Sequence, residues 1–183
     1  MQAQETEIEK LPDTLIHEPL NWLFAEHYRH RQLCKLIDML ASSAAYNEEG
    51  MDEVIAFLEH DMPLHVLDEE EDLFPLLRRR AVPDDDLEHV LGVLSGEHKT
   101  DVDRVSALLF ALIKARADRK SPALNPGLRT LLTEFATHER KHIALENAVI
   151  LPIARLRLQL CDLQALSARL AARRGRLLES DKE

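Results

Sequence analysis

The sequence predicts an all-α protein, an up-down-up-down antiparallel four-helix bundle with a C-terminal helical extension. The chain has 183 residues, among which leucine, alanine, glutamate and arginine are frequent and only five are glycine, a composition that favours helix. Apolar residues recur in several long segments with the period near 3.6 that amphipathic helices require. Because the breaks between these segments are short, consecutive helices should lie side by side and run in opposite directions.

Turns and prolines set the boundaries of the predicted elements. Residues 1–12 are mostly polar and acidic, and we expect them to form a mobile leader before a bundle domain at residues 13–153. The four bundle helices are predicted at about residues 13–45, 51–80, 85–118 and 128–150. The first could instead begin after Pro19, while Pro63 should interrupt and bend the second, and Pro152 should bend or end the fourth.

Residues 154–183 are predicted to form an amphipathic C-terminal helix and tail. One face carries leucines at three- and four-residue spacing, namely Leu156, Leu160, Leu163, Leu166, Leu170 and Leu177. The other face ends in a basic cluster, Arg169, Arg173, Arg174 and Arg176. The apolar face must pack against another surface. Two partners are possible: the flank of the bundle, or the same helix of a second chain in a homodimer. The basic end could be a solvated face or a contact for an acidic partner or a membrane surface.

Composition excludes some classes of function. The formal net charge of −10 argues against nucleic-acid binding, which relies on lysine and arginine at the phosphates. No apolar run approaches the roughly 20 residues of a membrane-spanning helix, and the acidic start is unlike a secretory signal. The two cysteines, Cys34 and Cys161, lie far apart and form no disulfide framework, so we expect a cytoplasmic protein. Cys34 is interpreted as a buried small apolar residue or, alternatively, as a redox-active thiol.

Two segments of the chain share the same sequence pattern. The segments His65–Pro75 and His142–Pro152 each begin with histidine, have glutamate four residues later, and end with proline six residues after the glutamate. On a helix, residues four apart lie on one face, with their Cβ atoms about 5–6 Å from each other. Apolar neighbours turn this face toward a core, so each stretch presents an imidazole and a carboxylate there as a two-pronged clamp for a metal.

A second motif repeats together with the first. Glu26-His27 stands in the middle of the first predicted helix, and Glu97-His98 stands in the middle of the third. The chain therefore looks like two copies of one helical hairpin, with Glu-His followed by His-x-x-x-Glu in each. Such a repeat predicts a pseudo-two-fold axis with a shared site at its centre.

The inward polar residues at mid-helix form one candidate metal site: His27, His65, Glu69, His98, His142 and Glu146. Two carboxylates buried without counter-charge would be very costly, and a pair of divalent metals would supply that charge. Both carboxylates could bridge the metals while two imidazoles complete each one, a nitrogen and oxygen set suited to iron, manganese, zinc or copper. The alternative is a hydrogen-bonded polar layer without metal. The Glu-x-x-His spacing of ferritin-like bundles does not fit these positions, because histidine comes first here.

With these motifs, residues from about Leu15 to Arg155 resemble the hemerythrin-like, or HHE cation-binding, domains. The resemblance rests on both Glu-His pairs, on the His-x-x-x-Glu-Glu-x-x-Leu-Phe-Pro run of the second helix, and on the His-x-x-x-Glu with downstream proline of the fourth. It implies a non-haem centre of two iron ions that also share an oxo or hydroxo group. By this resemblance the four histidines would be terminal ligands, and Glu69 and Glu146 would bridge the irons.

The third and fourth helices depart from the oxygen-carrying hemerythrins. Those proteins have His-x-x-x-His on the third helix and His-x-x-x-x-Asp on the fourth, whereas here Val102 stands four residues after His98 and the fourth helix has His-x-x-x-Glu. The chain is therefore similar to the six-ligand branch, which includes bacterial proteins linked to nitric oxide and to repair of iron–sulfur centres. With Val102 in the place of a second histidine, more positions on the metals stay open, which favours reactive chemistry over simple oxygen carriage.

The resemblance implies a protein that binds or reacts with dioxygen, nitric oxide or peroxide, in sensing, storage or stress protection. Two further functions remain open. One is an enzyme-like role in peroxide or nitric oxide detoxification or in iron–sulfur cluster repair. The other is an interaction module whose iron centre reports redox state through the C-terminal helix.

Four further residues are candidates for an outer layer around the metals: His30, Asp101, His138 and Glu70. His30 follows His27 by three residues, and it could be an extra ligand, a partner of a ligand, a proton carrier or a core-edge histidine bound to a carboxylate. Asp101 holds the equivalent position after His98. His138 lies one turn before His142 and could be a solvent-edge histidine or a seventh ligand. Glu70 could orient a ligand imidazole or belong, with the two acidic residues after it, to a solvated face.

Overall fold

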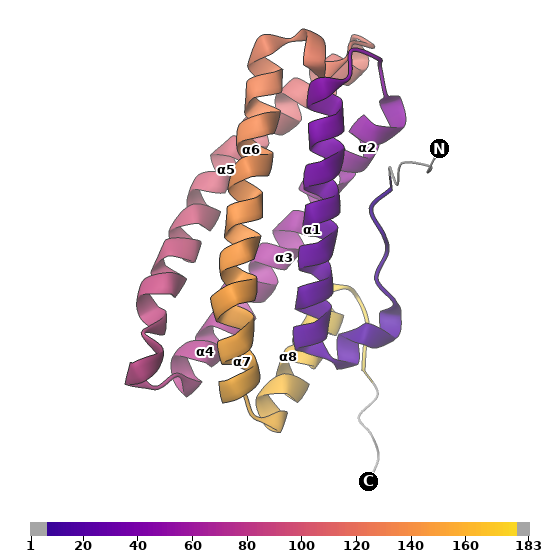
Figure 1. Cartoon of the computed structure of the whole chain (residues 1–183). Helices are drawn as coiled ribbons and strands as arrows, with labels where there is room; N and C mark the ends of the chain where they lie inside the picture. The colour runs from indigo at the N-terminus through magenta and orange to yellow at the C-terminus, as the bar shows by residue number, and fades with distance from the viewer. Residues whose placement is uncertain (1–6, 179–183) are drawn as a thin grey trace, which may run out of the picture.

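The computed structural model describes residues 7–178, and all regular structure within that range is helical, without a β-strand (Figure 1). The predicted all-α class is therefore confirmed. The α-helices, in chain order, are α1 (Pro19–Ser42), α2 (Glu48–Ala56), α3 (Met62–Leu67), α4 (Phe74–Arg80), α5 (Leu87–Ala117), α6 (Pro126–Leu145), α7 (Leu151–Arg157) and α8 (Leu160–Arg173). Short 3₁₀ turns lie at η1 (Asp13–His17), η4 (Pro83–Asp85) and η5 (Pro122–Leu124). None of the helices in the described range combines the length and the apolar character that crossing a membrane requires.

Several of these helices join end to end, so that the described residues contain four long helical columns. The backbone stays helical from α2 through α3 to α4, and again from α6 to α7. α1 packs along α6, α2 packs against α1 and α5, and α4 packs against α5 and α7. Figure 1 shows α1 running upward in the view beside α6, which runs downward. Asparagines begin two of the columns: the Asn47 side chain accepts from an amide of α2, and the Asn125 side chain accepts from two amides of α6.

Three wider π-helical turns connect the pieces of these columns: η2 (Phe57–Asp61), η3 (Asp68–Leu73) and η6 (Glu146–Ile150). Each precedes an α-helix that has a proline in its first turn, namely Pro63, Pro75 or Pro152. A proline ring collides with the carbonyl four residues earlier, and the extra residue of a wider turn moves that carbonyl away. The α-helical pattern is therefore interrupted by a wider turn just before Pro63, as expected. At Pro152 the helix does not end, because it widens in η6 and continues through α7.

The core consists of two apolar clusters with a polar layer between them. Along α1, Leu23 belongs to one cluster and Leu33 to the other, and the buried His27 and His30 lie between them. The other columns follow the same order, since the buried residues between their apolar segments also include histidine or acidic side chains. The polar layer therefore crosses the molecule between two apolar regions that shield it from water.

The C-terminal segment differs from the single helix that the sequence predicted over residues 154–183. α7 continues the fourth column, the backbone becomes extended at Leu158, and α8 then packs against α1, η1 and η3. Leu166 and Leu170 are buried in the flank of the bundle, so the bundle itself covers that part of the apolar face. Leu156 is exposed, and it lies in α7, before the extended residue Leu158, so it does not share a helix face with the buried leucines of α8.

The two ends of the chain bear on the predicted domain boundaries. Residues 1–6 of the expected leader and residues 179–183 of the expected tail lie outside the described residues. Ile8 is buried against the bundle, and its amide donates to the Glu53 side chain over 3.3 Å. The structure thus places Ile8 in the core, although the sequence analysis assigned it to the mobile leader.

The two cysteines are predicted to differ in reactivity. Cys34 is buried in α1, where burial, assisted by the charge of Glu139, raises the pKa of its thiol to about 12, whereas Cys161 is exposed. Since the thiolate is the reactive form, a thiol reagent at about pH 8 should label one cysteine in the folded chain and both in denaturant. Mass spectrometry of the labelled protein would check this. Rapid labelling of Cys34 in the folded protein would contradict the expectation and favour the redox-active alternative.

Candidate metal centre

The structure brings the six predicted metal-site residues together in the polar layer. They come from every column: His27 from α1, His65 from α3, Glu69 from η3, His98 from α5, His142 from α6 and Glu146 from η6. All six are buried, with no more than 7% of any residue exposed. The two glutamates lie in π-helical turns, a local widening that is frequent at functional sites. Residues that are far apart in the sequence therefore converge on one point inside the bundle.

The six side chains form two groups that share both carboxylates. Position 1 is defined by His27 and His65, position 2 by His98 and His142, and both include Glu69 and Glu146. In each group, one nitrogen or oxygen atom from every residue lies within 4.8 Å of those from the other three. Each group could hold one metal ion, and the two positions repeat each other as the duplicated hairpin pattern predicted.

The shared carboxylates point one oxygen at each position. Glu146 directs Oε2 toward position 1, 3.3 Å from His27 Nε2, and Oε1 toward position 2, 3.1 Å from His142 Nε2. Glu69 is arranged in the same way, since each of its oxygens lies 3.5 Å from the Nε2 atom of a histidine, one in each position. This is the arrangement that a pair of bridging carboxylates requires.

Glu26 and Glu97 turn two of the histidines toward the centre. His65 Nδ1–H donates to Glu26 Oε2 over 3.0 Å, and His142 Nδ1–H donates to Glu97 Oε2 over 2.7 Å. Such a bond leaves Nε2 available to a metal and makes it a stronger ligand. The sequence analysis missed both glutamates. The signal was present, because each is the first residue of a repeated Glu-His pair and so stands at equivalent points of the two hairpins.

The other two histidines are oriented by the residues that follow the shared glutamates. His98 Nδ1–H donates to Glu70 Oε1 over 2.7 Å. This contact fits the prediction from the sequence that Glu70 could orient a ligand imidazole. His27 Nδ1–H donates to Asn147 Oδ1 over 2.8 Å. The repeat therefore extends to the surrounding contacts, with a carboxylate in one half of the chain and an amide in the other.

Most of the atoms that face the centre lack hydrogen-bond partners within the described residues. These atoms are Nε2 of His27 and His65 and both carboxylate oxygens of Glu69 and Glu146, all of them buried. At position 2 the two Nε2 atoms, of His98 and His142, form a hydrogen bond with each other over 3.0 Å. A buried polar atom without a partner costs about 1–3 kcal/mol, and more if it is charged. A set of this kind fits a bound cation, and imidazole nitrogens with carboxylate oxygens suit iron, manganese, zinc or copper.

The electrostatics of the centre favour positive charge there. Burial lowers the pKa of His27 and of His142, but the carboxylates beside them outweigh burial, raising the pKa of His27 to about 9 and that of His142 to about 11. Burial opposes ionisation of Glu146, yet the neighbouring imidazoles hold the pKa of its carboxyl below its usual value. Burial keeps the pKa of His65 well below its usual value. A metal would therefore displace protons from His27 and His142 as it bound.

His30 lies beside position 1 but belongs to neither group. Its ring centre is 4.5 Å from that of His65, and its Nδ1–H donates to Glu139 Oε1 over 2.6 Å. Burial opposes ionisation of Glu139, but the bond from His30 together with the charges of the His30, His142 and His65 imidazoles outweighs burial and lowers the pKa of that carboxyl to about 2. Of the roles raised from the sequence, the contact fits a core histidine bound to a carboxylate. Glu139 was missed, since nothing in its spacing separates it from a surface glutamate.

Asp101 and His138 contact each other at the edge of the centre. His138 Nε2 lies 3.2 Å from Asp101 Oδ2, and both side chains are partly exposed. Val102 is 64% exposed, so α5 turns Asp101 toward the bundle and Val102 toward solvent. This corrects the interpretation of Val102, because a histidine at that position would point away from the metals. The number of free coordination positions on each metal must instead be inferred from the number of ligands that the centre provides.

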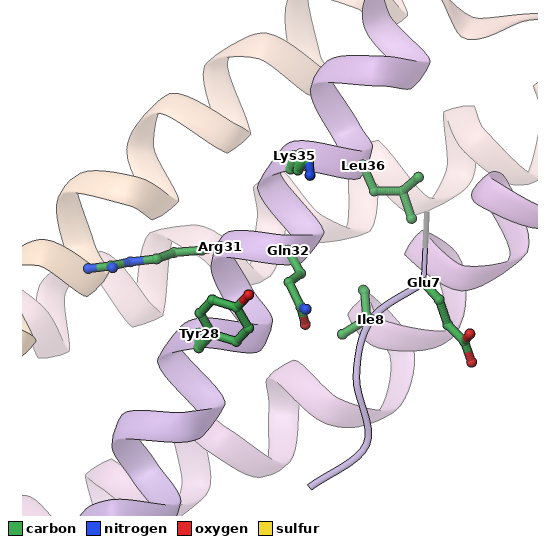
Figure 2. Close-up of a pocket in the computed structure, with 7 residues that line it drawn as sticks. All are labelled: Glu7, Ile8, Tyr28, Arg31, Gln32, Lys35 and Leu36. Carbon is green, nitrogen blue, oxygen red and sulfur yellow. The ribbon is translucent and has the colours of Figure 1, made fainter. Parts of the chain in front are cut away.

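The surroundings of the two positions differ in exposure. The side chains of Glu70 and Glu97, which orient the histidines of position 2, are 30% and 31% exposed, whereas that of Glu26 at position 1 is 5% exposed. Position 2 therefore lies nearer to solvent. A separate surface pocket of about 150 Å³ lies between the N-terminal segment and α1, and Figure 2 shows its lining: Glu7, Ile8, Tyr28, Arg31, Gln32, Lys35 and Leu36. It includes none of the six centre residues.

Comparison with known families agrees with this geometry. A family model described as the hemerythrin HHE cation binding domain matches residues 18–154, which confirms the resemblance found from the motifs. The match contains all six centre residues and ends before α8 begins. No curated protein matches the chain.

Proposed function

We propose that this chain, which belongs to the hemerythrin HHE cation-binding family, holds two iron ions and binds or reacts with dioxygen, nitric oxide or peroxide at them. The residues in this proposal are His27 and His65 for one iron, His98 and His142 for the other, and Glu69 and Glu146 as bridges. The observation that carries the proposal is the set of buried imidazole and carboxylate atoms that converge without partners of their own. When bound, iron would supply electrons for the reduction of dioxygen, peroxide or nitric oxide.

The scaffold in this proposal is the up-down-up-down antiparallel four-helix bundle, with one histidine from each long helix. The contacts of α1 with α6, of α2 with α1 and α5, and of α4 with α7 support it. We also propose that the protein works in the cytoplasm, which two free cysteines, Cys34 and Cys161, support. A homodimer through the C-terminal region stays a prediction, and the exposed Leu156 and Leu160 are residues that it would bury.

Ligand count favours reaction over reversible carriage. Each iron would receive four protein ligands, two imidazoles and an oxygen from each shared glutamate. Iron in such sites commonly takes about six ligands, so both irons would keep positions for solvent or a small molecule. A carrier that binds oxygen at one iron needs the other to be closed, whereas here the two positions have equal counts. We therefore favour consumption of the small molecule, as in stress protection, and the enzyme-like alternatives are peroxide or nitric oxide detoxification and iron–sulfur cluster repair.

Exposure of the di-iron(II) protein to oxygen is expected to produce the di-iron(III) protein, without recovery when the gas is removed. The reason is the equal openness of the two irons. Visible absorption spectra should be recorded before oxygen, after oxygen and after degassing, with parallel additions of nitric oxide and of excess peroxide. Full recovery over many cycles, with no peroxide turnover, would show that the protein binds reversibly and would overturn the reactive form of the proposal.

Two variants sharpen this experiment. His30→Leu is expected to slow the conversion by about tenfold or more if the buried pair of His30 and Glu139, which lies beside position 1, delivers a proton in the reaction. His17→Ala changes an exposed histidine outside the polar layer and should leave the rate unchanged. Equal rates in the wild type and in His30→Leu would remove His30 from the chemistry and leave it as a packing residue.

A further inference from the structure

We infer that Arg174 positions the ligand His65 through Glu26, which gives position 1 of the metal centre a charged support from the C-terminal segment that the histidines of position 2 lack. The inference rests on the proposed function, because it assumes that position 1 holds a metal. It concerns a part of the chain beyond the family match, which ends at residue 154, whereas α8 begins at Leu160.

A continuous line of contacts joins α8 to the metal ligand. Arg174 Nη2 donates to Glu26 Oε1 over 3.0 Å and to Asp68 Oδ2 over 2.7 Å. The other oxygen of Glu26 accepts the Nδ1–H of His65 over 3.0 Å. Glu26 and Asp68 are both buried, so the guanidinium is the counter-charge that lets two carboxylates lie within a few ångströms of each other. The cation also lies over the ring of Trp22, 5.0 Å from its centre, which further limits its movement.

Two more arginines of α8 hold the π-helical turn η3, which carries the shared ligand Glu69. Arg173 donates to Asp68 and to Asp72, and Arg169 donates to Asp72 over 2.7 Å. Asp72 is buried, which corrects its interpretation as part of a solvated face, whereas Glu71 is exposed as that interpretation expected. The basic end of α8 is therefore engaged by the bundle, and it is not a free surface for a membrane or an acidic partner.

Position 2 has no equivalent support. Its orienting residues, Glu70 and Glu97, contact His98 and His142, and within residues 7–178 neither forms an ion pair with lysine or arginine. The second oxygen of Glu70 accepts from the uncharged hydroxyl of Ser95 over 2.9 Å. Both carboxylates are about one-third exposed and so can move with solvent. The other π-helical turn, η6, contains only one acidic residue, the shared ligand Glu146. The two metal positions are thus alike in their ligands and unlike in what holds the ligands.

The consequence is a difference in how fast the two positions release metal. Position 1 should release its metal slowly, because Glu26 cannot swing away from His65 while Arg174 holds its other oxygen. Position 2 should release its metal faster, since Glu70 is held from behind by a neutral hydroxyl, that of Ser95, and neither Glu70 nor Glu97 is held by a charged partner such as Arg174. Changes in the outer partners of a ligand commonly alter metal affinity about 10- to 100-fold.

The test measures metal release from the full chain loaded with cobalt(II), whose visible absorption reports its coordination. Excess chelator is added, and the wild type should lose its cobalt in two phases of equal amplitude. Arg174→Leu is expected to speed the slow phase by about tenfold and to leave the fast phase within about twofold. Arg174→Lys keeps the charge but loses the planar guanidinium fork, and the rate of its slow phase should lie between those of the wild type and of Arg174→Leu. The matched control is Arg176→Leu, two residues further along, which pairs with Asp13 over 2.7 Å and not with Glu26 or η3, and which should release cobalt as the wild type does.

A double variant tests whether Arg174 acts through Glu26. Glu26→Gln should also speed the slow phase, and Arg174→Leu should add nothing in that background, because the two residues serve one contact. Equal release from Arg174→Leu and Arg176→Leu, or a full additional effect in the double variant, would overturn the inference, as would a single release phase in the wild type. Arg174→Lys supplies the comparison if the leucine variant does not fold by circular dichroism. A wild type that takes up fewer than two cobalt ions would instead contradict the proposed function.

Discussion

Replacing Glu146 by alanine is expected to empty both metal positions. One oxygen of Glu146 lies 3.3 Å from His27 Nε2 and the other lies 3.1 Å from His142 Nε2, so each metal would lose a ligand and part of its counter-charge. Wild-type protein loaded with iron without oxygen should contain about two irons per chain, and the variant should contain close to none. Elemental analysis of both proteins would check this.

Controls separate loss of a ligand from general damage. Glu134→Ala removes an exposed glutamate from α6, the helix that leads into η6 and Glu146, and should retain the iron of the wild type. His65→Ala should lose iron and lower stability, because it leaves position 1 with a single imidazole. One iron per wild-type chain, or zinc alone after growth with ample iron, would contradict the di-iron proposal. Full iron content in Glu146→Ala would contradict the bridging role.

Much of the centre could be predicted because a helix converts sequence spacing into position. His65 and Glu69 must share a face, as must His142 and Glu146, once each stretch is helical. The repeat of the Glu-His pairs then indicated that the helices meet at a common centre. Burial of these residues inside a bundle followed from the apolar residues on either side of them, and the structure places them there.

The sequence did not determine the rotation of α5 about its axis precisely enough to decide which of two neighbouring residues faces the bundle. Val102 and Phe110 are apolar and yet exposed, so the apolar pattern of this helix does not mark one face. A shift of one residue turns a helix by about 100°, which exchanges Asp101 for Val102 at the inner side. The packing of α5 against α6 and α2 decides between them, and that packing is not encoded in spacing alone.

The layer around the ligands depends on contacts between helices. Neighbouring residues on a helix point in different directions, so Glu26 faces His65 while His27 faces the metal positions. The role of the arginines at the end of α8 could not be predicted for the same reason. A basic face on a terminal helix is compatible with solvent or with a partner, and only the docked position of α8 shows that Arg173 and Arg174 meet buried carboxylates.

Chelating the metals is expected to lower the melting temperature of the wild type by on the order of 10 °C. A metal that binds only the folded chain stabilises it by about 4.1 kcal/mol when its free concentration is 1,000 times the dissociation constant. In a chain of this size, each kcal/mol shifts the melting temperature by about 2–4 °C. Circular dichroism melts of the iron-loaded protein, with and without chelator, would measure the shift.

The same measurement decides between a metal centre and a metal-free polar layer. A layer stabilised by its own hydrogen bonds would melt at the same temperature with or without chelator, and that result would contradict the proposal. The unpartnered oxygens of Glu69 and Glu146 predict the opposite, since they gain their interactions from a cation. Glu146→Ala supplies the control: its melting temperature should not respond to chelator, because it has no metal to lose. A chelator effect of equal size in that variant would place the stabilising metal elsewhere in the chain.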